Sequence, residues 1–208
     1  MILLDVNGTL MDFKSIKGKI FNEMTLPYFR KWGFKGTPGE LKRVIAEVDE
    51  YLKYRIHTLK DYPREVAGRL DLKVSEDEIH QENSDFKQMM IEGVQLLPGT
   101  KEALKKLSAL DSLAIFTNGW DQIVFPALKK FEILNYFSDV VCIGGTGLHK
   151  EGGHVFPELK RRGAWAMIGD KPEVDGLCEK SGIAFVDVRQ GWSKTVEEII
   201  DLKRRMPK

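Results

Sequence analysis

The sequence predicts an α/β protein, in which a Rossmann-like parallel sheet with helices on both faces carries an inserted all-helical domain. Residues 93–208 alternate apolar runs typical of strands with amphipathic stretches typical of helices, as in a parallel sheet covered on both faces. Residues 14–92 show helical periodicity instead. The apolar run at residues 2–4 is a strand candidate that this helical block separates from the other strands. The simplest organisation is an α/β core of residues 1–13 and 93–208, with residues 14–92 inserted as a helical cap.

The length and composition are those of an ordinary globular protein without a strong overall charge. The chain has 208 residues, a length that favours two domains or one domain with an insertion. Its 32 basic and 31 acidic residues give a formal net charge of +1. This balance provides no general attraction to nucleic acid or to an acidic membrane, so neither is expected as a partner.

The sequence favours a cytoplasmic location. No charged and then apolar leader precedes the first strand, and no apolar run approaches the ~20 residues of a membrane span. Cys142 lies in an apolar run and Cys178 in a helical pattern, as expected of buried thiols in a reducing compartment.

Two capping boxes mark helix starts in the helical block. Residues 37–40 (Thr-Pro-Gly-Glu) and 75–78 (Ser-Glu-Asp-Glu) each place a hydroxyl three residues before an acid. Apolar residues at helical spacing over 41–59 predict one long helix after the first box, ended by Pro63. The second box predicts a helix to about residue 90.

The remaining elements follow from the same two patterns. Further strands are expected at residues 112–117, 139–143, 165–168 and 183–188. Helices are expected over residues 100–107, 121–130, 155–162 and 173–180, and a final helix is expected to begin at Thr195, which opens a third capping box.

Polar residues stand at the ends of three of the expected strands. Asp5, Thr117 and Asp170 each lie at or just beyond the C-terminal end of a strand. In a parallel sheet these ends share one edge, and ligands bind outside that edge where the strand order reverses. The three side chains are therefore expected to meet at one site.

Four short motifs resemble those of the haloacid dehalogenase superfamily. They are Asp5-Val-Asn7-Gly-Thr-Leu, Thr117-Asn-Gly, Lys150 and Gly169-Asp170-x-x-x-x-Asp175, in that order along the chain. Members of this superfamily are mostly phosphatases with an aspartate nucleophile and magnesium, and some carry a helical cap after the first motif. The resemblance spans nearly the whole chain, and it implies a magnesium-dependent phosphohydrolase acting on a small phosphorylated molecule.

The resemblance implies a role for each motif residue. Asp5 is the expected nucleophile, because an ionised carboxylate can attack phosphorus in line and form an acyl phosphate. Thr117, with the backbone amides of Asn118 and Gly119, is expected to hold phosphoryl oxygens. Lys150 is expected to offset the charge between nucleophile and phosphate.

Lys160 is the competing candidate for that lysine, but it falls in a helical pattern close to the last motif.

The acidic residues of the first and last motifs suit a magnesium ion. Asp5, Asp170 and Asp175, with the backbone carbonyl of Asn7, provide the hard oxygen ligands that Mg²⁺ prefers. Asp170 is expected to bind the ion directly, whereas Asp175 can support the direct ligands without binding the ion itself.

Asn7 departs from the phosphatase pattern. Similar phosphatases carry a second aspartate there, which protonates the leaving oxygen and then activates water. An amide cannot shuttle a proton, and losing such help typically costs ~100- to 10,000-fold in rate. We therefore expect weak activity that favours acyl or aryl phosphates, or a substitute acid from the cap, for which His57 is a candidate.

The sequence leaves three alternatives open. A 2-haloacid dehalogenase using Asp5 also lacks the second aspartate and has a similar second motif, but dehalogenases of this superfamily need no metal and usually lack a pair such as Asp170 and Asp175. A phosphonate hydrolase that forms a Schiff base, with Lys53 as the candidate lysine, is more distant. A non-catalytic protein that binds a phosphorylated ligand or a partner would explain Asn7, but not the retained nucleophile, lysine and acids.

Overall fold

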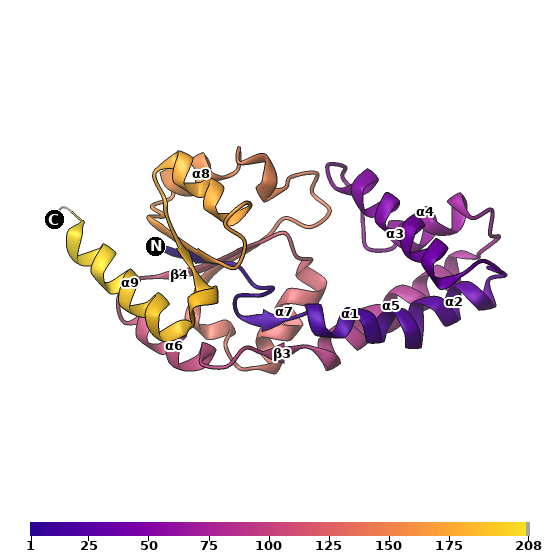
Figure 1. Cartoon of the computed structure of the whole chain (residues 1–208), viewed down its shortest axis with the longest axis horizontal. Coiled ribbons are helices and arrows are strands. Elements are labelled where there is room, and N and C mark those ends of the chain that lie inside the picture. The colour runs from indigo at the N-terminus through magenta and orange to yellow at the C-terminus, as the bar shows by residue number, and fades with distance from the viewer. Residues whose placement is uncertain (207–208) are drawn as a thin grey trace. The chain divides into compact units, whose positions relative to one another are not determined.

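A five-stranded parallel sheet forms the centre of the α/β part of the protein, seen in a computed structural model that describes residues 1–206 (Figure 1). The strand order is β5-β4-β1-β6-β7. The strands are β1 (Ile2–Leu4), β4 (Leu113–Thr117), β5 (Phe137–Cys142), β6 (Ala166–Gly169) and β7 (Ala184–Asp187). The fold class predicted from the sequence, a parallel α/β sheet with an inserted helical domain, is confirmed.

The first strand lies in the middle of this sheet. Leu4 pairs with Ile115 of β4 on one side and with Ile168 of β6 on the other. After β1 the chain builds β4 and β5 on one side and then crosses over to build β6 and β7 on the other. The order therefore reverses beside β1, and Asp5 leaves the sheet at that point.

Helices cover both faces of the sheet. In Figure 1, α8 lies on one side of the strands, whereas α6 and α9 lie together on the other. The helices of this part are α6 (Thr100–Ser108), α7 (Asp121–Lys130), α8 (Phe156–Arg161) and α9 (Trp192–Arg205), with 3₁₀ turns η2 (Leu134–Tyr136), η3 (Lys150–Gly152), η4 (Asp175–Ser181) and η5 (Val188–Gln190). A small antiparallel pair joins β2 (Met11–Asp12) to β3 (Gln95–Leu96).

Two expectations for this part are wrong in detail. The segment expected as an α-helix over residues 173–180 forms the 3₁₀ turn η4 instead. The last helix begins at Trp192 rather than at Thr195, because Gly191 takes the N-cap position with a φ of 94°. The Thr195 hydroxyl donates to the Gly191 carbonyl at 3.0 Å from inside the helix, so it is not a cap.

The described chain divides into two units. The core unit comprises Met1–Asp12, Gln95–Gly144 and the chain from His149 onward. The helical unit comprises Phe13–Val94 and Gly145–Leu148.

The helical unit is held by its own apolar core. Its helices are α1 (Lys14–Ile20), the π-helical η1 (Phe21–Thr25), α2 (Leu26–Lys31), α3 (Pro38–Leu52), α4 (Asp61–Arg69) and α5 (Glu76–Gly93). Buried residues such as Phe29, Leu41, Val48 and Ile79 form one cluster between them. Both predicted capping boxes are present at α3 and α5. Within residues 1–206, no helix has the length and apolar character needed to cross a membrane.

The long helix expected over residues 41–59 ends at Leu52. The next residues turn away, and Ile56, which was expected on the buried face, is 87% exposed. The His57 N–H donates to the Gly145 carbonyl at 2.9 Å, and Ile56 pairs with Thr146. These extended contacts replace helical ones and explain why Gly145–Leu148 groups with the helical unit. Pro63 lies in the first turn of the new helix α4, where proline is tolerated.

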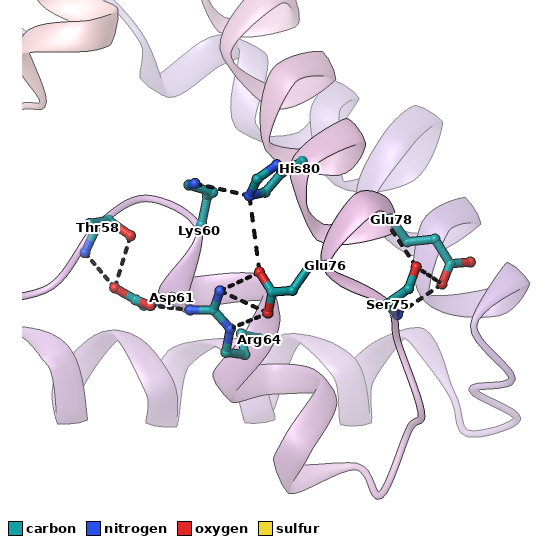
Figure 2. A network of polar contacts seen from close by, with 8 residues as sticks. All are labelled: Thr58, Lys60, Asp61, Arg64, Ser75, Glu76, Glu78 and His80. Carbon is teal, nitrogen blue, oxygen red and sulfur yellow. Dashed lines mark hydrogen bonds and ion pairs between the residues drawn. The ribbon is translucent and has the colours of Figure 1, made fainter.

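Surface ion pairs join α4 to the start of α5 (Figure 2). The Arg64 guanidinium donates to Glu76, with Nη2 2.8 Å from Oε2 and Nε 3.2 Å from Oε1. It also pairs with Asp61. The His80 Nε2 lies 4.0 Å from Glu76 Oε2 and accepts from Lys60 Nζ at 3.0 Å. Because Arg64 and Glu76 are exposed, these pairs contribute little to the stability of the unit.

Glu82 is a buried acid in the same unit. Its side chain on α5 is only 5% exposed. Burial, with the charge of Asp85 as a smaller cause, raises the pKa of Glu82 from 4.5 to about 7. The folded unit therefore binds this proton more tightly than the unfolded chain does, and its stability falls as the pH rises from about 4.5 to about 7.

We predict that Glu82→Gln stabilises the helical unit at high pH. At pH 8 the wild-type carboxylate is charged and buried, and the variant should gain roughly 1 to 3 kcal/mol in free energy of unfolding. At pH 5 the wild-type group is already neutral, so the gain should nearly vanish. Urea titrations followed by circular dichroism at both pH values measure the difference.

Glu50→Gln serves as the matched control for this prediction, because Glu50 lies on an exposed part of α3. Its effect should stay within about 0.5 kcal/mol at both pH values. A gain for Glu82→Gln that is the same at pH 5 and pH 8 would show that the Glu82 charge is not the cause.

Candidate functional site

The site begins with Asp5, directly after the central strand β1. Its backbone N–H donates to the Ile168 carbonyl at 2.9 Å, so β6 fixes the point at which the chain leaves the sheet. The Asp5 side chain is buried. A buried carboxylate is costly unless it is paired, and here a lysine pairs with it.

Lys150 is that partner, and it contacts two carboxylates. The Lys150 Nζ lies 2.7 Å from Asp5 Oδ1 and 2.6 Å from Asp175 Oδ1. Its side chain is almost completely buried, with a residue exposure of 1%, and Nζ lies 5.5 Å above the Phe116 ring. Removing one partner of such a buried pair leaves an uncompensated charge, which typically costs ~3–5 kcal/mol.

These contacts decide the charge states. Burial alone would lower the pKa of Lys150, but Asp5 and Asp175 outweigh it and raise that pKa above its usual value. Burial raises the pKa of Asp175 to about 6, while Lys150 opposes the shift and Asp5 adds to it. The ammonium therefore stays charged at neutral pH.

A third carboxylate completes an acidic cluster. Asp5, Asp170 and Asp175 each offer an oxygen, and these oxygens all lie within 4.8 Å of one another. Carboxylate oxygens in such a group fit a magnesium ion, which favours hard oxygen ligands. Asp175 is also used elsewhere, since Oδ1 pairs with Lys150 and Oδ2 accepts from the Lys171 N–H at 3.4 Å.

Two glycines make room for these carboxylates. Gly8 has a φ of 81°, and a Cβ built on it would overlap the Asp170 carboxylate. A Cβ built on Gly169 would overlap the carboxylate of Asp175 in the same way. The carboxylate of Asp170 can therefore lie against Gly8, and that of Asp175 against Gly169, because neither glycine has a side chain.

The second motif lies at the end of β4. The Thr117 hydroxyl is buried and accepts from the Gly119 N–H at 3.2 Å. The Asn118 Oδ1 accepts from the backbone N–H of Lys150 at 3.1 Å, and its Nδ2 donates to His149 Nδ1 at 3.3 Å. The side chain of Asn118 therefore holds the Lys150 loop, a contact for which the sequence carries no signal.

The other candidate residues lie on several different elements. Asn7 lies in the turn after β1, partly buried, and its backbone pairs with Met11. Lys160 donates to the Gly182 carbonyl at 2.6 Å from α8. His57 and Lys53 belong to the helical unit, where His57 Nδ1 lies 2.7 Å from the Arg55 carbonyl and Lys53 Nζ lies 3.8 Å from Glu50.

Solved structures with this fold include enzymes of two kinds. A 2-haloacid dehalogenase from Pseudomonas syringae pv. Tomato has 21% identity and a TM-score of 0.66, covering 91% of this chain and 86% of its own. A HAD phosphatase from Thermococcus onnurineus has 20% identity and a TM-score of 0.60, covering 89% and 84%. A magnesium-bound HAD-hydrolase of Bacillus subtilis has 17% identity and a TM-score of 0.64, covering 88% and 86%. At these identities the likeness concerns the fold.

The family assignment comes from the sequence as a whole. Comparison with curated proteins gives no significant match. The family model described as haloacid dehalogenase-like hydrolase matches residues 2–187, which include all four motifs. The chain therefore belongs to the haloacid dehalogenase-like hydrolases and is an enzyme of that family.

Proposed function

We propose that the protein is a magnesium-dependent phosphohydrolase that acts on a small phosphorylated molecule through an aspartyl-phosphate on Asp5. One observation carries the proposal. A buried lysine ammonium lies 2.7 Å from Asp5 Oδ1, and two further carboxylates offer oxygens within 4.8 Å of the Asp5 carboxylate. A nucleophile that must meet an anionic phosphate needs positive charge at this place.

The residues divide this work. Asp5 attacks phosphorus, and Lys150 keeps the carboxylate oriented while offsetting the charge of the incoming phosphate. Thr117 and the amides at Asn118 and Gly119, at the end of the neighbouring strand β4, bind phosphoryl oxygens. This assignment is consistent with the parallel register that brings the ends of β1 and β4 together.

Asp5 and Asp170 would hold the magnesium ion, with the Asn7 carbonyl as a further ligand and Asp175 in support. When bound, the ion neutralises charge on the phosphate and helps to orient it. The donor set supports this proposal, and the Bacillus subtilis structure shows that magnesium is bound by one protein of similar fold.

Asn7 limits the reaction. Its amide can donate a hydrogen bond to the leaving oxygen but cannot give a proton to it or take one from water. Substrates with good leaving groups, such as aryl and acyl phosphates, should therefore be favoured, and hydrolysis of the aspartyl-phosphate should be slow.

A 2-haloacid dehalogenase is the second candidate. Asn7 favours it, since displacement of halide by Asp5 needs no acid at that position, and dehalogenases are among the structures of similar fold. The acidic cluster of three carboxylates favours the phosphohydrolase, because it would repel a haloacid carboxylate unless a cation were bound there.

We predict that the protein with Mg²⁺ hydrolyses an aryl phosphate and that Asp5→Ala lowers kcat by at least about 1,000-fold, because no other group forms the covalent intermediate. Phosphate release in a steady-state assay measures this. Equal rates for the two proteins would contradict the role proposed for Asp5. Chloride release from 2-chloropropionate without metal would support the dehalogenase.

Asn7→Asp should restore proton transfer. We expect kcat/KM for alkyl phosphate esters to rise by about 100-fold, and for aryl phosphates by much less, since poor leaving groups depend most on an acid. A panel of esters that differ in leaving-group pKa measures both effects. A uniform loss across the panel would show that position 7 does not face the leaving oxygen.

Asp170→Asn should weaken magnesium binding. Titration of the wild-type protein with Mg²⁺ in a calorimeter is expected to show one site, and loss of one charged ligand should raise its Kd at least about tenfold. Asp201→Asn, an exposed change on α9, is the matched control and should leave the Kd unaltered. Unchanged binding in Asp170→Asn would place the metal elsewhere.

A further inference from the structure

We propose that the Asn118 side chain is a positioning residue that keeps Lys150 seated between Asp5 and Asp175. The catalytic consequence of this inference rests on the proposed function, but the seating itself does not. The carboxamide would act through Lys150, by holding the loop on which that lysine lies, and not on the substrate.

The loop that carries Lys150 depends on contacts from outside it. Lys150 opens the short 3₁₀ turn η3 within a glycine-rich segment, where Gly153 has a φ of 70°. Inside the loop, the Gly152 N–H donates to the His149 carbonyl at 3.1 Å and the Gly153 N–H to the Lys150 carbonyl at 2.8 Å. These bonds shape the turn, but they join neighbours and cannot fix its place beside β1.

Asn118 provides a fixed point for this loop. It follows the buried strand β4 directly, and its Oδ1 accepts from the Lys150 N–H at 3.1 Å across 32 residues of sequence. A strand in the centre of a paired sheet moves less than a glycine-rich loop does. The hydrogen bond therefore restrains the Lys150 backbone relative to the end of β4.

Both ends of the Asn118 carboxamide are used. While Oδ1 holds Lys150, Nδ2 donates to His149 Nδ1 at 3.3 Å, and that imidazole nitrogen also lies 3.8 Å from Glu151 Oε2. Only an amide of this length offers an acceptor and a donor on one carbon. Aspartate at position 118 would keep the acceptor for the Lys150 N–H but would have no N–H to donate to His149 Nδ1.

Correct seating matters because Lys150 has little tolerance for movement. Its ammonium contacts two carboxylates at 2.6 and 2.7 Å in a place where the residue is 1% exposed. A shift of the backbone would lengthen both contacts and leave Asp5 and Asp175 facing each other without the cation. Misplacement by ~1 Å can cost ~100-fold in rate when geometry controls the reaction.

The first test measures how firmly Lys150 is held and needs no enzymatic activity. Hydrogen exchange of the Lys150 amide and acylation of its side chain with acetic anhydride, both read by mass spectrometry, are compared in wild type, Asn118→Ala and Asn118→Asp. In Asn118→Ala both rates should rise by at least about tenfold. In Asn118→Asp the amide should keep its protection, because the acceptor oxygen remains.

Asn135→Ala is the matched control, since Asn135 is exposed on η2, and both rates should stay at wild-type values. Asn118→Ser, whose hydroxyl is too short to reach, should behave as Asn118→Ala does and serves if the alanine variant does not fold. Wild-type exchange and acylation at Lys150 in the folded alanine or serine variant would overturn the proposal.

The second test asks whether the position of Lys150 affects turnover. Asn118→Ala should lower kcat on an aryl phosphate by about 10- to 100-fold with a smaller change in KM, but by no more than about twofold when Lys150→Met is already present. Effects that multiply in the double variant would show that Asn118 acts independently of Lys150 and would overturn the proposal. If the wild-type protein has no phosphatase activity, the proposed function fails, while exchange and acylation still decide the seating.

Discussion

The structure of the site depends on one interaction, the pairing of a buried lysine ammonium with two carboxylates. Lys150 contacts Asp5 and Asp175, and each of these groups would be costly to bury alone. Together they hold the Asp5 carboxylate in place at the end of the central strand. Asp170 offers a third carboxylate oxygen within 4.8 Å of oxygens of Asp5 and Asp175, and such a group of oxygens fits a divalent ion.

The topology of the sheet makes this pairing possible. Because β1 lies between β4 and β6, residues from three separate parts of the chain leave the sheet at one edge. The glycines at positions 8 and 169 then allow the acids to come close, since a Cβ at either position would overlap a carboxylate. Asn118 at the end of β4 adds the link from this rigid edge to the Lys150 loop.

The sequence was a good guide to features that depend on local pattern and chain order. The polar residues at the strand ends predict that Asp5 and Asp170 lie close together, and they do. The capping box at Thr37 is also predictable, because all its hydrogen bonds lie within four residues. The Asn118 contact could not be predicted, since it depends on where a loop 32 residues away comes to lie. Helix ends were also missed: apolar spacing past Leu52 looked helical, but extended bonding to Gly145 determines that segment.

The central claim is that Asp5 becomes phosphorylated, and mass spectrometry of the acid-quenched protein tests it most directly. After incubation with Mg²⁺ and an aryl phosphate, we expect the peptide containing Asp5 to gain the mass of one phosphoryl group, because Asn7 should slow breakdown of the intermediate. Phosphate release without any label on Asp5, or a haloacid ester on Asp5 in its place, would contradict this account.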